Sequence, residues 1–145
     1  MVNDREPLER RPWEDVDPEV PHVWRTFGYR RPVAEPGHVV VEWDAPADYA
    51  FPTEGGHIVH GGLVATVLDT AMGGACWTLL VAHESFLTAE LRTEFHRAAR
   101  PGVLRADARV VHRTKRLMFC AGELYDADGV HLASARCTQV LRGGR

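Results

Sequence analysis

A long apolar run that contains a single carboxylate constrains the fold of this chain more than any other feature. It covers residues 61–82, and Asp69 lies near its middle among valine, leucine, alanine and methionine. A run of about 20 residues could span a bilayer, but a helix that is apolar nearly all round is equally typical of a protein core. Because Asp69 and four glycines interrupt the run, we expect a helix over residues 61–81 inside the domain, and no membrane partner.

The segments around this helix predict a sheet. Residues 38–44 alternate apolar and polar side chains, as a half-buried strand does. Four more strand-like runs follow the helix, at residues 88–96, 104–112, 117–125 and 130–141. The Asp-Ala-Asp-Gly joint before the last run favours a tight hairpin turn. We expect an α+β domain whose antiparallel sheet covers one long helix and leaves edge strands for pairing with a second copy.

The start of the chain differs in composition from the rest. Residues 1–20 mix prolines with charges, which is typical of a surface arm or mobile tail, so one domain is expected over residues 21–145. Apolar residues at helical spacing predict a short helix over residues 20–27, ended by Gly28. Charges stand where a signal peptide needs an apolar segment, so secretion is not expected.

Charge and cysteine content narrow the function classes. Lys and Arg number 17 against 20 Asp and Glu, a net charge of -3, which provides no global positive field for nucleic acid or an anionic membrane. The three cysteines, Cys76, Cys120 and Cys137, are odd in number and show no CxxC spacing. This pattern favours free thiols in a reducing cytoplasm.

Two glycines stand where the long helix is expected to begin. Unpaired backbone N–H groups at a helix start favour an oxygen that carries or develops negative charge, and Gly61 and Gly62 would let a ligand approach them closely. An ordinary glycine-rich turn explains the pair as well.

Asp69 lies about two turns into that helix, too far in to cap it, and its neighbours one turn away are mostly small. A partly desolvated carboxylate with space beside it could be a general base toward water or a nucleophile. A structural aspartate paired with an arginine or a hydroxyl is the alternative.

Other kinds of site find little support in the sequence. His57 and His60 supply only two metal ligands, with no third at a recognised interval. No GxSxG, Walker or Rossmann motif is present. We therefore expect neither a metal nor a cofactor.

The segment HGGLVATVLDTAMG, residues 60–73, resembles the HGGxxxxLxDxAxG signature of hotdog-fold acyl-CoA thioesterases, specifically the phenylacetate-degradation (PaaI-type) group of the 4-hydroxybenzoyl-CoA thioesterase superfamily. TAELRTEFHRAARPG, residues 88–102, is similar to the strand that follows the family's helix. The resemblance implies about five or six strands wrapped around one long central helix. It also implies hydrolysis of acyl-CoA in a homodimer, which can pair into a tetramer, with active sites at the dimer interface.

Carried over by position, the resemblance implies that Asp69 is the base or nucleophile. The Gly61 N–H would polarise the thioester carbonyl, an oxyanion-hole role. Thr88 falls where relatives have a serine or threonine near that carboxylate. His60 and Gly62, which belong to the same motif, would contact the substrate.

One position departs from the family pattern. Many relatives have an asparagine six residues before the motif histidine and a glycine three before it, where this chain has Glu54 and His57. An amide can donate a hydrogen bond to the thioester, whereas an ionised glutamate cannot. Three explanations stay open. His57 could take the place of the amide and contact the substrate, Glu54 could be an additional catalytic acid or base, or the departure could mark reduced activity.

The phosphates of CoA are negatively charged, so a protein that binds CoA needs basic side chains near them. Arg113, Lys115 and Arg116 are candidates, together with Arg97 and Arg100, although a solvated turn explains each of them as well.

Two other functions stay open on the same fold. The glutamate at position 54 is compatible with a protein that binds an acyl thioester without cleaving it, and an enoyl-thioester hydratase is a weaker possibility. The sequence does not define the acyl group. Tyr49, Phe51, Trp77 and Phe86 could line an acyl pocket, but core packing explains them equally.

Overall fold

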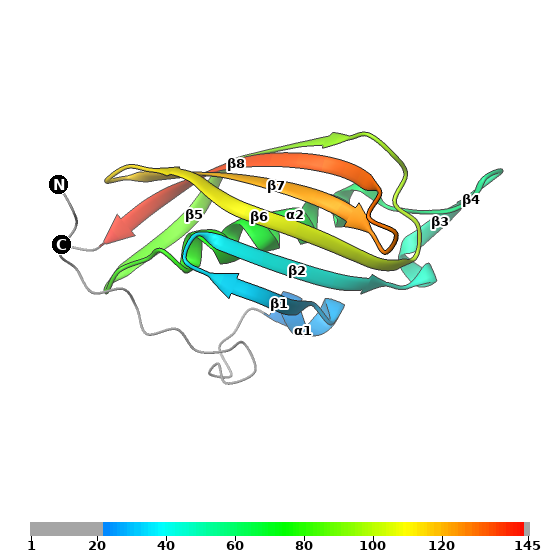
Figure 1. Cartoon of the computed structure of the whole chain (residues 1–145), viewed down its shortest axis with the longest axis horizontal. Coiled ribbons are helices and arrows are strands. Elements are labelled where there is room, and N and C mark those ends of the chain that lie inside the picture. The colour runs from blue at the N-terminus through cyan, green and yellow to red at the C-terminus, as the bar shows by residue number, and fades with distance from the viewer. Residues whose placement is uncertain (1–21, 144–145) are drawn as a thin grey trace.

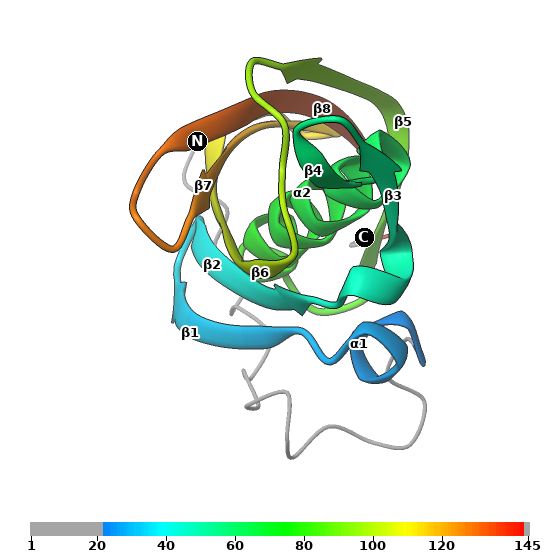
Figure 2. The same cartoon turned by 90° about the vertical axis from the view of Figure 1, so that its right-hand side faces the viewer.

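The computed structural model describes residues 22–143, and in it a curved antiparallel sheet wraps around one central helix (Figures 1 and 2). A short helix, α1 (His22–Phe27), precedes the sheet and ends at Gly28, whose φ of 69° is one that glycine adopts readily. The arm expected over residues 1–20, and the first two residues of the helix expected over 20–27, lie outside the described residues.

Helix α2 (Gly61–Trp77) is the central helix, and most of its apolar side chains are buried. It ends at Trp77 rather than at Val81, and the Thr78 hydroxyl lies just past this end. This hydroxyl donates to the Ala75 carbonyl at 2.6 Å and accepts the Gly37 N–H at 2.7 Å. No helix within residues 22–143 has the length and apolar character needed to cross a membrane.

The sheet has six strands, and every pair of neighbours is antiparallel, in the order β1-β2-β6-β7-β8-β5. The strands are β1 (Arg30–Glu35), β2 (His38–Ala45), β5 (Glu84–Phe95), β6 (Gly102–Arg113), β7 (Leu117–Asp126) and β8 (His131–Gly143). This arrangement confirms the expected α+β class and the hotdog architecture. All five predicted strands are present, with bounds that differ by a few residues.

Two parts of the fold were not predicted. Strand β1 was missed because arginines and Pro32 interrupt its pattern; it lies at an edge of the sheet, where a residue without an N–H is tolerated. The segment between the first predicted strand and the long helix, to which no element was assigned, holds a single 3-10 turn, η2 (Ala47–Tyr49), and a hairpin of β3 (Ala50–Thr53) and β4 (Gly56–Val59).

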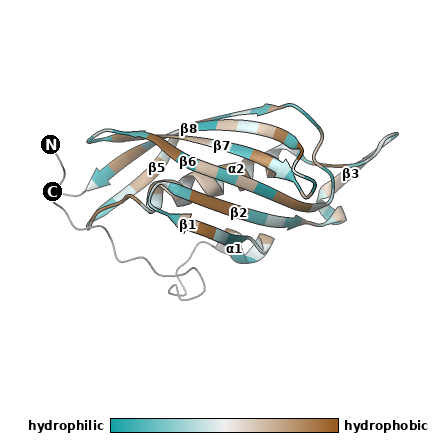
Figure 3. Cartoon of the chain, in the orientation of Figure 1, coloured by the Kyte–Doolittle hydropathy of each residue, from teal (hydrophilic) through white to brown (hydrophobic). Residues whose placement is uncertain are grey.

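Small residues on the inner face of the sheet let α2 approach closely. Ala106, Ala108 and Ala135 are buried there, and a Cβ placed on Gly122 would lie 3.3 Å from both Leu68 and Met72 of the helix. Figure 3 shows the strongly apolar stretch of β2 that lines the same core. The other edge strand, β5, has three exposed large apolar side chains: Leu87, Leu91 and Phe95.

Candidate active site

Asp69 is half-buried midway along α2, and its carboxylate faces strand β5. The Thr88 hydroxyl on β5 lies 3.3 Å from Asp69 Oδ1. Burial raises the pKa of Asp69 above its ordinary value, and the hydrogen bond from Thr88 opposes part of that rise. A carboxylate with a raised pKa is a stronger proton acceptor once it is ionised, which suits a general base.

A β-bulge between Thr88 and Glu90 lies beside this contact. Bulges re-aim side chains and are common next to active sites. Thr88 is the register partner of Gln139 on β8, and the Thr88 hydroxyl also lies 3.0 Å from Gln139 Oε1. Gln139 was missed at the sequence level. The available signal was a polar residue in phase with the inward-facing Cys137 and Leu141 of a strand.

The start of α2 lies at the other end of the site. His60 precedes the helix, and its side chain makes no capping hydrogen bond, so no side-chain cap from that residue satisfies the first N–H groups. A Cβ on Gly61 would lie 3.3 Å from the Phe95 ring, whereas one on Gly62 would meet nothing within 4 Å. The His60 ring packs against Phe51, with centroids 5.2 Å apart.

Gly61 and Asp69 are eight residues apart on one helix. At a rise of about 1.5 Å per residue, they are separated by about 12 Å along the helix axis. An oxygen held by the Gly61 N–H therefore lies too far from the Asp69 carboxylate of the same chain for both groups to act on one carbonyl.

The two upstream candidates lie on the β3–β4 hairpin. Glu54 is in its turn and His57 is on β4, and both side chains are exposed. Arg100 donates a hydrogen bond of 3.5 Å to the His57 carbonyl, which connects the hairpin to the segment after β5. No contact of either side chain with Asp69 or Thr88 is observed within the described residues.

A cavity of about 330 Å³ lies between this hairpin, the start of α2 and the end of β5. Its walls include Phe51 and Ile58 from the hairpin, Gly61 from the helix, and Phe95 from β5. Among the aromatic residues considered for an acyl pocket, Phe51 therefore lines this cavity. Trp77 and Phe86 pack against the core instead.

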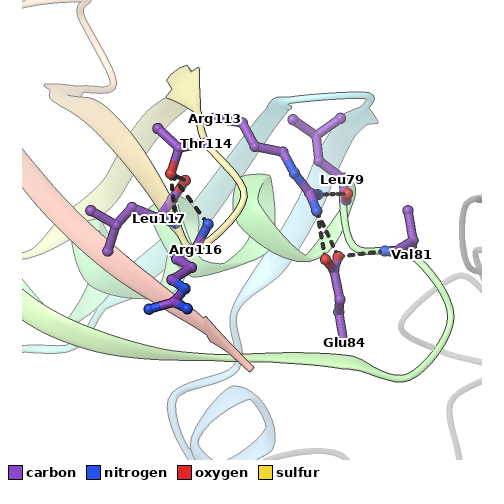
Figure 4. A network of polar contacts seen from close by, with 7 residues as sticks. All are labelled: Leu79, Val81, Glu84, Arg113, Thr114, Arg116 and Leu117. Carbon is purple, nitrogen blue, oxygen red and sulfur yellow. Dashed lines mark hydrogen bonds and ion pairs between the residues drawn. The ribbon is translucent and has the colours of Figure 1, made fainter. Parts of the chain in front are cut away.

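Figure 4 shows that Arg113 is engaged within the domain. Its guanidinium donates to both carboxylate oxygens of Glu84, at 2.7 and 2.8 Å, and to the Leu79 carbonyl. Glu84 is almost fully buried, and it also accepts the Val81 N–H at 2.9 Å. These contacts give Arg113 a structural role.

The other basic candidates are all exposed. Lys115 and Arg116 lie in the turn between β6 and β7. Arg97 donates to the His131 carbonyl at 3.4 Å, and Arg100 holds the hairpin as described above.

Across residues 22–143, no group of three or more histidine, cysteine, aspartate or glutamate side chains has a geometry suited to a metal ion. All three cysteines are buried and free of disulfide bonds.

Similarity to known proteins agrees with this geometry. The sequence profile of the thioesterase superfamily matches residues 56–133, more than half of the chain. A thioesterase family protein from Silicibacter pomeroyi is 27% identical, with a TM-score of 0.75 over 84% of this chain and 90% of that one. A phenylacetic acid degradation-related protein from Ralstonia eutropha JMP134 is 28% identical, with a TM-score of 0.76 over 83% of this chain and 90% of that one.

A mutant of a thioesterase enzyme from Staphylococcus aureus has a TM-score of 0.77 over 84% of this chain and 99% of that one, but at 20% identity it shows the fold alone. No curated protein matches the sequence. Since the superfamily profile spans the whole of α2 and the strands on both sides of it, the chain belongs to the thioesterase superfamily.

Proposed function

We propose that this protein hydrolyses an acyl-CoA thioester to a free acid and CoA without a metal or cofactor. The observation that carries the proposal is the half-buried Asp69 carboxylate, with its raised pKa, hydrogen-bonded to Thr88 in the middle of the central helix. Membership of the thioesterase superfamily supports thioester hydrolysis as the reaction.

In the proposed reaction, Asp69 acts on the thioester carbonyl carbon in one of two ways. As a general base it takes a proton from water while that water attacks the carbon, and as a nucleophile it attacks the carbon directly. The CoA thiolate leaves when the tetrahedral intermediate collapses, and it then takes up a proton. In the nucleophilic route the acyl group is left on Asp69 as a mixed anhydride, which a water molecule hydrolyses to release the free acid and restore the carboxylate. The Gly61 N–H at the uncapped start of α2 stabilises the oxyanion of that intermediate. Thr88 orients the carboxylate.

The separation of about 12 Å between Gly61 and Asp69 supports a site that combines two chains. Gly61 of one protomer and Asp69 of its partner would then face the same carbonyl. The exposed apolar side chains of β5 support a homodimer that pairs along this edge of the sheet. Two such dimers could associate further into a tetramer.

Lys115 and Arg116 are the better candidates for the CoA phosphates, because Arg113 already pairs with Glu84. His57, His60 and Gly62 lie on or next to the hairpin and helix start, where the thioester would be held. We place the enzyme in the cytoplasm, which is compatible with three unbridged cysteines.

Binding of a thioester without cleavage is the second candidate function. It is favoured by Glu54, which is exposed on the hairpin where an amide donor is expected. Tight binding of acyl-CoA with no release of thiol would support it over hydrolysis.

The decisive experiment measures thiol release from aryl, short, medium and long acyl-CoAs. Asp69→Asn should lower kcat by at least about 100-fold. Asp128→Asn, the same chemical change at an exposed turn position, is the matched control and should keep the wild-type rate. Full hydrolysis by Asp69→Asn would remove Asp69 from the mechanism.

A further inference from the structure

Gln139 is an uncharged polar side chain inside the core, directly behind the candidate carboxylate. It has 0% exposure and lies on β8, opposite Thr88 on β5 and Met118 on β7. Its amide contacts Thr88 on one side, at 3.0 Å, and the Cys137 sulfur on the other, at 3.3 Å. A buried amide costs free energy unless its groups are paired, so its position requires an explanation.

The numbers of hydrogen-bond donors and acceptors around Thr88 explain why an amide is buried here. The Thr88 hydroxyl has a single proton and lies near two acceptors, Asp69 Oδ1 at 3.3 Å and Gln139 Oε1 at 3.0 Å. It can donate to only one of them. Meanwhile the Gln139 N–H groups face the Cys137 sulfur, which is a weak acceptor.

A half turn of the Gln139 amide about its last bond exchanges the nitrogen and the oxygen with almost no change in shape. In that orientation Cys137 S–H donates to Oε1, Nε2–H donates to the Thr88 oxygen, and the Thr88 hydroxyl donates to Asp69. Each of these donors then has its own acceptor. The chain of bonds ends on a carboxylate, where a hydrogen bond is strongest.

We propose that Gln139 is a positioning residue of the candidate site, whose amide N–H holds the Thr88 oxygen so that the Thr88 proton points at Asp69. Gln139 is fully buried, so it would act on the site through Thr88. The hydrogen bond between Thr88 and Asp69 does not depend on the proposed function; only the importance of Gln139 for turnover rests on that function.

A hydrogen bond from Thr88 stabilises the ionised form of Asp69, so it lowers the pKa that burial raises. The titratable groups that the surrounding elements bring toward this network are Cys137 on β8, Cys120 opposite it on β7, and Cys76 on α2 itself. Burial raises the pKa of Cys76 to about 12 and also raises that of Cys120. These two thiols therefore stay uncharged over the pH range in which Asp69 titrates. Hydrogen bonds from Cys120 and from the Gln139 amide lower the pKa of Cys137, and burial opposes that shift. In the turned orientation of the amide, the contribution from Gln139 is lost.

The orientation of the amide can be tested by NMR in the wild-type protein, without any substitution. We expect nuclear Overhauser effects from the Gln139 Nε2 protons to the Thr88 methyl group. Effects from those protons to the Cys137 Hβ protons alone would place the oxygen toward Thr88 and overturn the proposal.

The consequence for Asp69 can be tested by carbon-13 NMR titration of its carboxyl group. Gln139→Met, which keeps the length of the side chain, should raise the pKa of Asp69 by roughly half to one unit, because Thr88 loses its orientation. An unchanged pKa would mean a merely structural role, and a lowered pKa would mean that the hydroxyl had pointed at Gln139. Either result overturns the proposal. Should Gln139→Met unfold, Gln139→Leu serves in the same titration.

Two further variants show whether Gln139 acts through Thr88. In a Thr88→Val background, Gln139→Met should cause no additional change in the Asp69 pKa, and a second shift of the same size would contradict the relay. Thr138→Val, next to Gln139 on β8 but on the opposite face of the sheet, is the matched control and should leave the pKa unchanged.

The two proposals can fail separately. The titrations need no substrate, so they test Gln139 whatever the reaction is, whereas turnover by Asp69→Asn tests the reaction. If both hold, Gln139→Met shifts the acidic limb of the kcat profile to higher pH by the same amount and leaves KM unchanged.

Discussion

The hydroxyl of Thr88 lies 3.3 Å from Asp69 Oδ1 and connects the central helix to the edge strand β5. It is the only side-chain hydrogen bond observed to this carboxylate among residues 22–143. Burial raises the pKa of Asp69, and this hydrogen bond lowers it. Movement of β5, the strand through which we expect the dimer to form, would therefore change the proton affinity of Asp69. If the proposed dimer forms along β5, we expect assembly to affect the chemistry at Asp69 through this pair.

A two-chain site predicts that inactive variants rescue each other. Gly61→Val blocks the helix start and Asp69→Asn removes the carboxylate, so each homodimer should be inactive. In a mixed dimer one of the two sites is intact, and random exchange of subunits should restore about a quarter of wild-type turnover. Activity is measured after the two proteins are unfolded and refolded together.

A mixture of Asp69→Asn with Asp69→Ala is the control for this experiment, because it cannot assemble an intact site. If the Gly61→Val and Asp69→Asn mixture stayed equally inactive, both groups would have to act from one chain.

The raised pKa of Asp69 predicts how the stability of the fold depends on pH. Because the folded protein holds this proton more tightly than the unfolded chain, the contribution is favourable below the unfolded value of 3.8 and is lost as pH rises through the folded pKa. Asp69→Asn removes this loss. The Tm of the variant, minus that of wild type, should become more positive between pH 4 and pH 8, as measured by differential scanning calorimetry. A difference in Tm that stays constant with pH would show that burial does not shift the pKa of Asp69.

The Arg113–Glu84 pair predicts a stability effect rather than a binding effect. Arg113→Met leaves the almost fully buried Glu84 without its cation, which should cost about 3 kcal/mol in the free energy of unfolding. Glu84→Gln in the same chain should recover part of that loss. Urea denaturation measures both changes.

Lys115→Ala provides the contrast, since its side chain is exposed in the neighbouring turn. It should change the free energy of unfolding by less than about 0.5 kcal/mol and raise KM for acyl-CoA. A rise in KM for a folded Arg113→Met protein, with no loss of stability, would assign phosphate binding to Arg113 instead.

Two adjacent glycines of α2 predict opposite outcomes for the same substitution. A Cβ on Gly73 would meet the Phe86 ring at an ordinary 3.5 Å, whereas one on Gly74 would lie 3.2 Å from the buried Val39. Gly73→Ala should therefore stabilise the helix by up to about 1 kcal/mol. Gly74→Ala should gain less or lose stability, because Val39 has to move in a packed core. Equal gains in thermal unfolding would indicate that Val39 moves freely.

Much of this protein was predictable from local patterns. The long apolar run fixes the central helix and puts Asp69 inside it, because a helix buried on nearly all sides needs apolar residues at nearly all positions. Alternation located five strands for a similar reason. Strand β1 and the β3–β4 hairpin were not predicted, because a peripheral strand and a short exposed hairpin bury too few side chains to produce a clear alternation of apolar and polar residues.

What faces Asp69 was decided only by the tertiary structure. Thr88 pairs with Gln139, 51 positions further along the chain, and the bulge after Thr88 reverses which residues of β5 point inward. Uninterrupted alternation would place Glu90 on the inner face, whereas the register places Leu91 opposite the inward-facing Cys137. Strand register depends on which distant segments meet, and a shift of one residue exchanges the two faces. The sequence alone therefore determines the carboxylate and the helix that carries it, and the pairing of β5 with β8 determines its partners.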